Sequence, residues 1–99
     1  MPNSLKVKVS YLGYIRVMLG KREEEMELKE GATIGDLLNM LSDKYGEAFR
    51  KEVYEPGLQD LKYGYGVIIN GLLMARLQGL KTPLKDGDQV ILTTLISGG

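Results

Sequence analysis

The chain has 99 residues, and its 13 basic and 13 acidic side chains leave a formal charge of zero. This length suits one compact domain, and the balanced charge lacks the basic surface that is typical of nucleic-acid binders. The absence of cysteine and histidine excludes disulfides, thiolate nucleophiles, imidazole bases and the commonest ligands of zinc and iron. We therefore expect a single domain over residues 1–99 that is not an enzyme and binds no nucleic acid.

The N-terminal residues lack the charged segment and apolar run of a signal peptide. Every apolar stretch is far shorter than the roughly 20 residues that cross a bilayer. We expect a cytoplasmic protein without a membrane partner.

The first third of the chain predicts two strands around a short helix. Residues 5–11 alternate between apolar and polar side chains, as a half-buried strand does. Apolar residues in 12–19 recur at spacings of three and four, which indicates one or two helical turns before Gly20. Residues 23–28 predict an acidic strand with Met26 and Leu28 inward and its glutamates on a solvated face.

The clearest helix is predicted after Gly31. Thr33 is a good N-cap, and Asp36 three residues later completes a variant of the capping box. Apolar residues at 34, 37, 38, 41 and 45 share one helical face, which we assign to the core. A second helix is expected between residues 47 and 54.

The remainder of the chain predicts a loop followed by short strands. Tyr54, Tyr63 and Tyr65 are expected to anchor the loop on the domain. Residues 67–69 read as a strand, Asn70-Gly71 as a tight turn, 72–77 as a further short strand and 89–95 as the final strand. The order predicts an α+β fold with one mixed sheet packed on one main helix, with the last strand in the middle.

The sequence ends in Ser97-Gly98-Gly99, which we expect to form a flexible tail from about residue 95. Extended, residues 95–99 would reach about 16 Å beyond the fold, far enough to enter another protein's active site. Glycine lacks a Cβ, so its backbone passes a narrow channel and its carbonyl is open to attack. The carboxylate of Gly99 would first need activation by ATP, and because the chain has no phosphate-cradling loop, we expect ATP and Mg²⁺ on a partner.

Residues before the tail are candidates for binding that partner. Simple alternation along the last strand places Val90 and Leu92 inward and Ile91 and Thr93 outward. Leu95 and Ile96 lie beyond the predicted sheet. We therefore expect Ile91, Thr93, Leu95 and Ile96 to contact the partner, with Ser97 and Gly98 leading to the reactive Gly99.

Several segments, in this order, resemble the MoaD/ThiS group of ubiquitin-like sulfur carriers, especially its small archaeal ubiquitin-like modifiers. They are VKVSY at 7–11, IRVMLG at 15–20, LKEGATIGDLL at 28–38, VIING at 67–71, LKDGDQV at 84–90 and SGG at 97–99. The resemblance implies a ubiquitin-like β-grasp fold and an E1-like activating enzyme that adenylates Gly99. The product would become a thiocarboxylate that gives sulfur to a sulfur-accepting enzyme, or would be joined to target lysines by an isopeptide bond.

The sequence leaves two alternative functions open. The chain could be the small subunit of molybdopterin synthase, the sulfur donor in molybdenum cofactor biosynthesis. It could instead be a non-covalent β-grasp binding module with an inert tail, in which case deletion of Gly99 would leave its activity unchanged.

Overall fold

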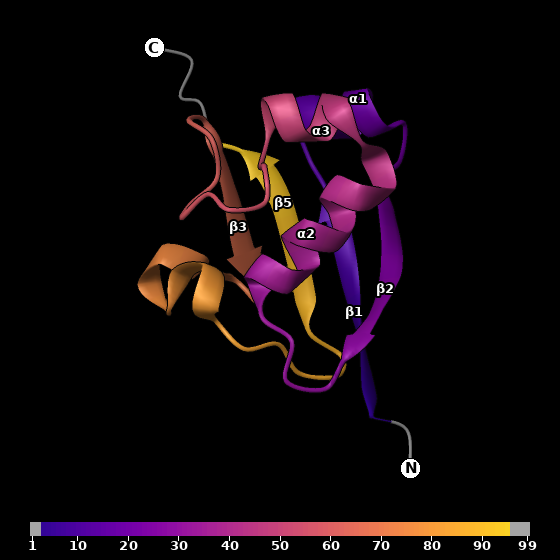
Figure 1. The fold of residues 1–99 in the computed structure, drawn as a ribbon, viewed down its shortest axis with the longest axis vertical. Coiled ribbons are helices and arrows are strands. Elements are labelled where there is room, and N and C mark those ends of the chain that lie inside the picture. Colours follow the sequence, from indigo (N-terminus) through magenta and orange to yellow (C-terminus); the bar gives the residue numbers. More distant parts are fainter. Residues whose placement is uncertain (1–2, 96–99) are drawn as a thin grey trace.

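The computed structural model describes residues 3–95, which form a five-stranded sheet, three α-helices and two short 3₁₀ helices (Figure 1). The strands are β1 (Ser4–Tyr11), β2 (Glu23–Lys29), β3 (Tyr65–Ile69), β4 (Leu72–Leu73) and β5 (Gln89–Thr94). The α-helices are α1 (Tyr14–Leu19), α2 (Ile34–Tyr45) and α3 (Glu47–Glu52), and the 3₁₀ helices are η1 (Met74–Arg76) and η2 (Gly79–Lys81).

The sheet is mixed and has the order β2-β1-β5-β3-β4, so the last strand lies in the middle as predicted. β5 runs parallel to β1, with Val9 opposite Val90, and antiparallel to β3. The remaining pairs are antiparallel. The short helix α1 connects β1 to β2. Because β1 and β5 are parallel neighbours, their C-terminal ends lie side by side at the same end of the sheet.

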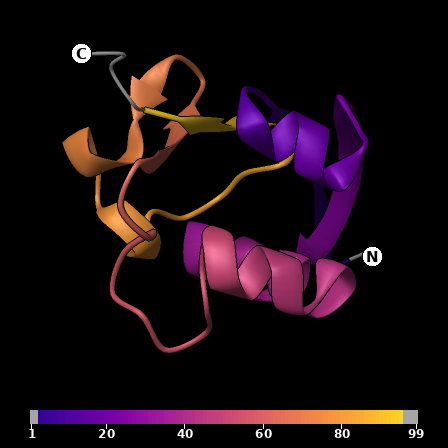
Figure 2. The ribbon, with the colours of Figure 1, turned by 90° about the horizontal axis from the view of Figure 1, so that it is seen from above.

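Helices α2 and α3 cover one face of the sheet (Figure 2). The side chains of α2 at positions 34, 37, 38 and 41 are buried against inward residues of β1, β3 and β5, which confirms the predicted core face. The capping box is also present, because the Thr33 hydroxyl accepts from the Asp36 amide and the Asp36 carboxylate accepts from the Thr33 amide. These caps satisfy backbone donors that the first helical turn leaves free.

The acidic strand β2 differs from its prediction at one position. Glu24 lies on the inward face with Met26 and Leu28, and its side chain is only 10% exposed. A carboxylate can occupy such a site because Tyr11, Tyr45, Lys21 and Lys44 all donate hydrogen bonds to it. The interpretation of the whole glutamate run as a solvated face was therefore wrong at Glu24.

The segment 72–77 is a strand for two residues only. Met74 turns its side chain into the core, where it is 5% exposed, and the chain continues as the 3₁₀ helix η1. The Asn70-Gly71 turn that precedes it is confirmed, because both residues have positive φ angles, 50° and 90°.

Of the three tyrosines expected to anchor the loop, two do so. Tyr54 is buried, and the Tyr65 hydroxyl donates to Glu52 at 2.7 Å. Tyr63 is fully exposed, so the prediction was wrong for this residue. A membrane-spanning helix would need greater length and more apolar residues than any helix found within residues 3–95.

Candidate functional site: the tail root and the open face of the sheet

The last two described residues, Thr94 and Leu95, form what we call the tail root. The Leu95 amide donates a hydrogen bond to the Gly64 carbonyl at 2.7 Å. Three residues earlier in the chain, the Leu92 carbonyl accepts a hydrogen bond from the Leu12 amide at 3.0 Å. These bonds fix the direction in which the chain leaves the sheet. Residues 96–99 lie outside the described part of the chain, so the predictions for Ile96, Ser97, Gly98 and Gly99 stay predictions.

Helix α1 begins directly against the tail root. Gly13 has a φ of 69°, and a Cβ at this position would lie 1.9 Å from the Thr94 Oγ1 atom. Only a residue without a side chain fits here, because the space is occupied and because positive φ disfavours other residues. The glycine therefore allows the start of α1 to touch the end of β5.

The face of the sheet away from α2 carries an apolar region that continues from the tail root. We call it the open-face patch and define it as Ile68, Leu73, Ile91, Thr93 and Leu95. Its members share one face because Ile68 is opposite Ile91 in the β3–β5 ladder and opposite Leu73 in the β3–β4 ladder. Leu73 and Leu95 are 41% and 51% exposed, so the patch is accessible at both ends.

Thr93 lies on the predicted face but is buried, with 8% of its surface exposed. Its neighbour across the ladder is Gly66, and the Leu95 side chain occupies the space that a side chain on Gly66 would fill. Leu95 therefore folds back next to Thr93 instead of extending away from the sheet. Thr93 is therefore on the predicted face without being exposed, whereas Ile91 is half-exposed there. The role of both residues in binding a partner stays a prediction.

The other half of the same face is charged. Lys6 and Lys8 of β1 stand opposite glutamates of β2, and Lys8 pairs with Glu23 at 3.3 Å. Such exposed ion pairs add little stability, about 0–1 kcal/mol each. The charged residues of β1 and β2 occupy one half of the face away from α2, so the apolar part of this face is confined to β5, β3 and β4.

Sequence reasoning missed Ile68, Leu73 and Gly66 as parts of this surface. The sequence predicted a strand over residues 67–69 without assigning its faces, and the structure buries Val67 and Ile69 and leaves Ile68 partly exposed. The Asn70-Gly71 turn carried the missing signal, because a two-residue turn sets the register and places Leu73 opposite Ile68.

Glu24 and its four hydrogen-bond donors, Tyr11, Lys21, Lys44 and Tyr45, form what we call the Glu24 cluster. It lies near the same end of the sheet, since Tyr11 is opposite Leu92. Partial burial raises the pKa of Glu24, but hydrogen bonds from Lys44, Tyr11, Tyr45 and Lys21 outweigh it and lower the pKa to about 2. Burial, together with the Glu24 carboxylate, raises the pKa of the Tyr11 phenol far above its ordinary value. The Glu24 carboxylate is therefore ionised at neutral pH, and its hydrogen bonds join β1, β2 and α2.

A second polar contact holds the loop beside the tail root. Burial and the neighbouring Glu52 carboxylate raise the pKa of Tyr65, which keeps the phenol protonated and able to donate. Gly64, whose carbonyl accepts from Leu95, is the residue before it. The Tyr65–Glu52 bond thus steadies the acceptor of the tail root.

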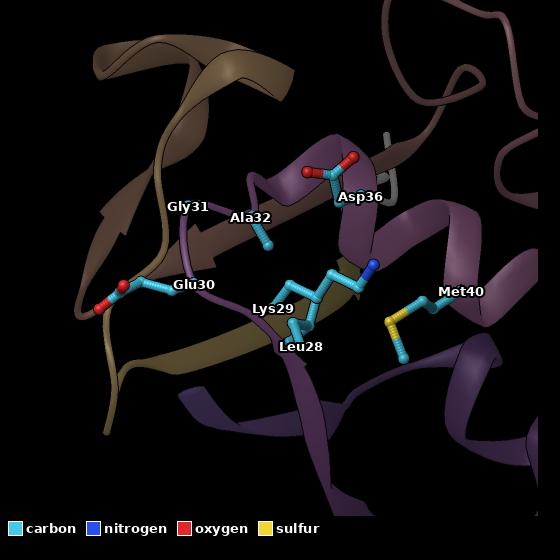
Figure 3. A pocket seen from close by; sticks show the side chains of 7 residues that line it. All are labelled: Leu28, Lys29, Glu30, Gly31, Ala32, Asp36 and Met40. Carbon is cyan, nitrogen blue, oxygen red and sulfur yellow. The ribbon is translucent and has the colours of Figure 1, made fainter. Parts of the chain in front are cut away.

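Figure 3 shows a pocket of about 450 Å³ at the C-terminal end of β2. Because β2 runs antiparallel to β1 and β5 runs parallel to β1, this end of the sheet is opposite the tail root. The pocket is lined by residues 28–32 together with Asp36 and Met40 of α2. The Asp36 carboxylate is already bonded to Thr33 in the helix cap. No group of three or more Asp, Glu, His or Cys side chains in the described range 3–95 could hold a metal ion.

The fold and the placement of the tail root define a ubiquitin-like β-grasp protein, and comparison with known proteins supports this class. The structure of small archaeal modifier protein 1 from Methanosarcina acetivorans superposes with a TM-score of 0.77 at 28% identity, covering 97% of this chain and 98% of that one. The model of the ThiS family matches residues 9–99. The chain belongs to the ThiS family.

Two relatives similar to this chain have names that indicate different functions. Ubiquitin-related modifier 1 of Encephalitozoon cuniculi is 33% identical, over 94% of this chain and all of that protein. The molybdopterin synthase sulfur carrier subunit of Mycobacterium tuberculosis is 29% identical, over 96% of this chain and 99% of that protein. The homologues are thus ubiquitin-like modifiers and sulfur carriers, which agrees with the function implied by the sequence resemblance.

Proposed function

We propose that this protein is a carrier in which the carboxylate of Gly99 is the reacting group. The observation that carries the proposal is the match of the ThiS family through residue 99, combined with a central strand that ends at the tail root. The protein is then a substrate of an activating enzyme, and its own fold serves to present the tail.

The first chemical step is adenylation on the activating enzyme, which binds ATP and Mg²⁺. A carboxylate oxygen of Gly99 attacks the α-phosphorus of ATP, the bond between the α- and β-phosphates breaks, and pyrophosphate leaves. The product is a mixed anhydride with a reactive carbonyl. The cation and the enzyme's positive groups stabilise the charge on the phosphates.

The second step decides between the two carrier functions. Attack on the carbonyl by hydrosulfide expels AMP and gives a thiocarboxylate, which a sulfur-accepting enzyme can use. Attack by a target lysine amine, which loses a proton, expels AMP and gives an isopeptide bond. Relatives named as a modifier and as a sulfur carrier subunit support both outcomes.

The open-face patch is the proposed docking surface of the activating enzyme. Its exposed ends, Leu73 and Leu95, present apolar groups, and burying one such side chain stabilises a complex by about 1.5–3 kcal/mol. The patch leads directly to the tail root. An enzyme that covers the patch would therefore receive the tail at its edge.

The test is mass spectrometry of the protein after incubation with host lysate, ATP and Mg²⁺. Exchange of one terminal oxygen for sulfur in the intact mass identifies a thiocarboxylate. Lys85 is the last basic residue, so trypsin would leave residues 86–99 as a branch on a target lysine. A Ser97→Arg variant shortens this branch to Gly98-Gly99 and provides an independent mass signature.

A variant that lacks Gly98 and Gly99 is the control. It should give neither product, because it lacks the reacting carboxylate in its proper position. If the wild-type protein also gives neither product in a lysate with a competent activating enzyme, the carrier function is contradicted. Unchanged biological activity of the deletion variant would favour a non-covalent binding module with an inert tail.

A second candidate function is the small subunit of molybdopterin synthase. The similarity to the Mycobacterium tuberculosis subunit over nearly the full length of both chains favours it. Transfer of sulfur from the thiocarboxylate to a molybdopterin precursor, in the presence of a synthase large subunit, would support this function. Formation of isopeptide branches without such transfer would favour the modifier.

A further inference from the structure

Helix α1 is apolar on its outer side as well as its inner side. Five of its six residues are apolar or aromatic, and Ile15 fills the core. Tyr14 and Val17 point outward and are 53% and 75% exposed, and Leu12 just before the helix is 37% exposed. Surface helices normally present polar residues outward, and a helix that is hydrophobic all round is usually covered.

The exposed residues Leu12, Tyr14 and Val17, which we call the α1 surface, lie beside the tail root. The Leu12 amide binds the Leu92 carbonyl, and Gly13 touches Thr94. Continuing the parallel register by one residue places Leu12 next to Thr93 of the open-face patch. The α1 surface therefore lies on the β1 side of the C-terminal end of β5. The open-face patch covers β5 and extends over β3 and β4 on its other side.

The short tail limits how far the protein that holds the Gly99 carboxylate can be from the α1 surface. Residues 96–99 span at most about 14 Å beyond Leu95, using 3.3–3.6 Å per residue. A protein that holds the Gly99 carboxylate must therefore approach within that distance of the tail root. The start of α1 contacts the tail root, so the same protein comes close to the α1 surface.

We propose that the α1 surface is a second docking surface for the activating enzyme, and that it packs against an uncharged apolar region of that enzyme. This inference rests on the proposed function. The enzyme contacts both sides of the end of β5, with the open-face patch on one side and Val17 and Tyr14 on the other. The tail leaves the domain between the two contacts, which limits the directions in which it can enter the active site and lowers the entropy cost of ordering it.

The test uses ATP–pyrophosphate exchange catalysed by the purified activating enzyme of the same organism, with the full-length carrier as the varied substrate. Val17→Asp places a charge in the proposed apolar contact. Because Val17 is largely exposed, the variant should fold normally, which thermal unfolding checks. We expect the KM for the carrier to rise about tenfold or more, with kcat unchanged, because a charge buried without a partner weakens binding.

Leu72→Asp is the matched control. Leu72 is 53% exposed and lies in β4, which starts at the end of β3 that is remote from the tail root. Its substitution adds the same charge and should leave the KM unchanged. An equal rise of the KM for both variants would overturn the proposal, since the effect would then come from charge alone.

The remaining outcomes separate this inference from the proposed function. Exchange that requires Gly99 but has the same KM for Val17→Asp and the wild type overturns the α1 surface and leaves the carrier function intact. Absence of any Gly99-dependent exchange with the wild-type protein overturns both. A second variant, Tyr14→Asp, should raise the KM in the same way, and a lack of effect there would also count against the proposal.

Discussion

The side chain of Leu95 lies over Gly66, so that a Cβ on this glycine would come within 2.3 Å of the Leu95 Cδ1 atom. Gly66 is opposite Thr93 in the β3–β5 ladder, and Leu95 follows Thr93 on the same face. The glycine thus creates the space in which the first tail residue rests on the sheet. This contact sets how the apolar surface continues from β5 into the tail.

Gly66→Ala should displace the Leu95 side chain with little loss of stability. The clash involves the end of a flexible side chain, so we expect a change in unfolding free energy within about 1 kcal/mol. Nuclear Overhauser effects between the Leu95 methyl groups and residue 66 should weaken, and Thr93 should become more exposed. Unchanged methyl contacts would contradict the packing described here.

Gly13→Ala should be more destabilising than Gly20→Ala. Both glycines have nearly the same φ, 69° and 70°, but a Cβ on Gly20 meets no atom within 4 Å, whereas one on Gly13 meets Thr94. The strain of positive φ costs each variant about 1–2 kcal/mol. Chemical denaturation should show an additional loss of about 1–3 kcal/mol for Gly13→Ala alone.

The Thr94→Ala background tests the origin of this difference. Removal of the Oγ1 atom takes away the closest clash, so Gly13→Ala should cost less in this background than in the wild type. Equal costs in both backgrounds would show that the Gly13–Thr94 contact does not determine the position of α1.

Glu24→Gln should destabilise the domain near neutral pH and reduce its sensitivity to acid. The folded state lowers the pKa of Glu24 from 4.5 to about 2, so the stability it contributes is present above about pH 4.5 and is lost as the pH falls toward 2. We expect a loss of about 1–3 kcal/mol at pH 7, because hydrogen bonds to a charged group are weakened. The difference between variant and wild type should shrink between pH 5 and pH 2 in urea unfolding.

Glu27→Gln provides the matched control on the same strand. Glu27 is exposed on the opposite face of β2, so its substitution should change stability by less than about 0.5 kcal/mol. An equal effect of both substitutions would mean that overall charge, and not the Glu24 cluster, determines the response to acid.

Leu95→Asp should weaken recognition by the activating enzyme while leaving the fold intact. Leu95 is half-exposed at the tail root, and we expect its substitution to raise the KM for the carrier about tenfold, as loss of one apolar anchor would. Leu72→Asp, at a similarly exposed leucine, should show a normal KM. If Leu95→Asp also has a normal KM, the open-face patch does not dock the enzyme.

Local sequence patterns were sufficient for the order of elements and for most of the core. The alternation in residues 5–11, the Thr33–Asp36 cap and the Asn70-Gly71 turn all depend on neighbours within a few positions, and the structure contains each of them. The order of the predicted elements also placed the last strand in the middle of the sheet.

The differences come from contacts between distant residues. Glu24 is inward because Tyr45 and Lys44, some 20 positions later, supply donors, and a strand pattern cannot show this. Thr93 is buried because Gly66 leaves room for Leu95. The apolar outer side of α1 could not be linked to the tail from the sequence, because the sheet pairing is what brings α1 next to the end of β5.

The most direct test of the central claim is ATP–pyrophosphate exchange by the activating enzyme with the wild-type protein and with a variant that lacks Gly99. We expect exchange that depends on the concentration of the wild-type protein and is lost when Gly99 is removed, while thermal unfolding of the domain is unchanged. Exchange at the same rate with the shortened protein would contradict the claim that Gly99 carries the reacting carboxylate.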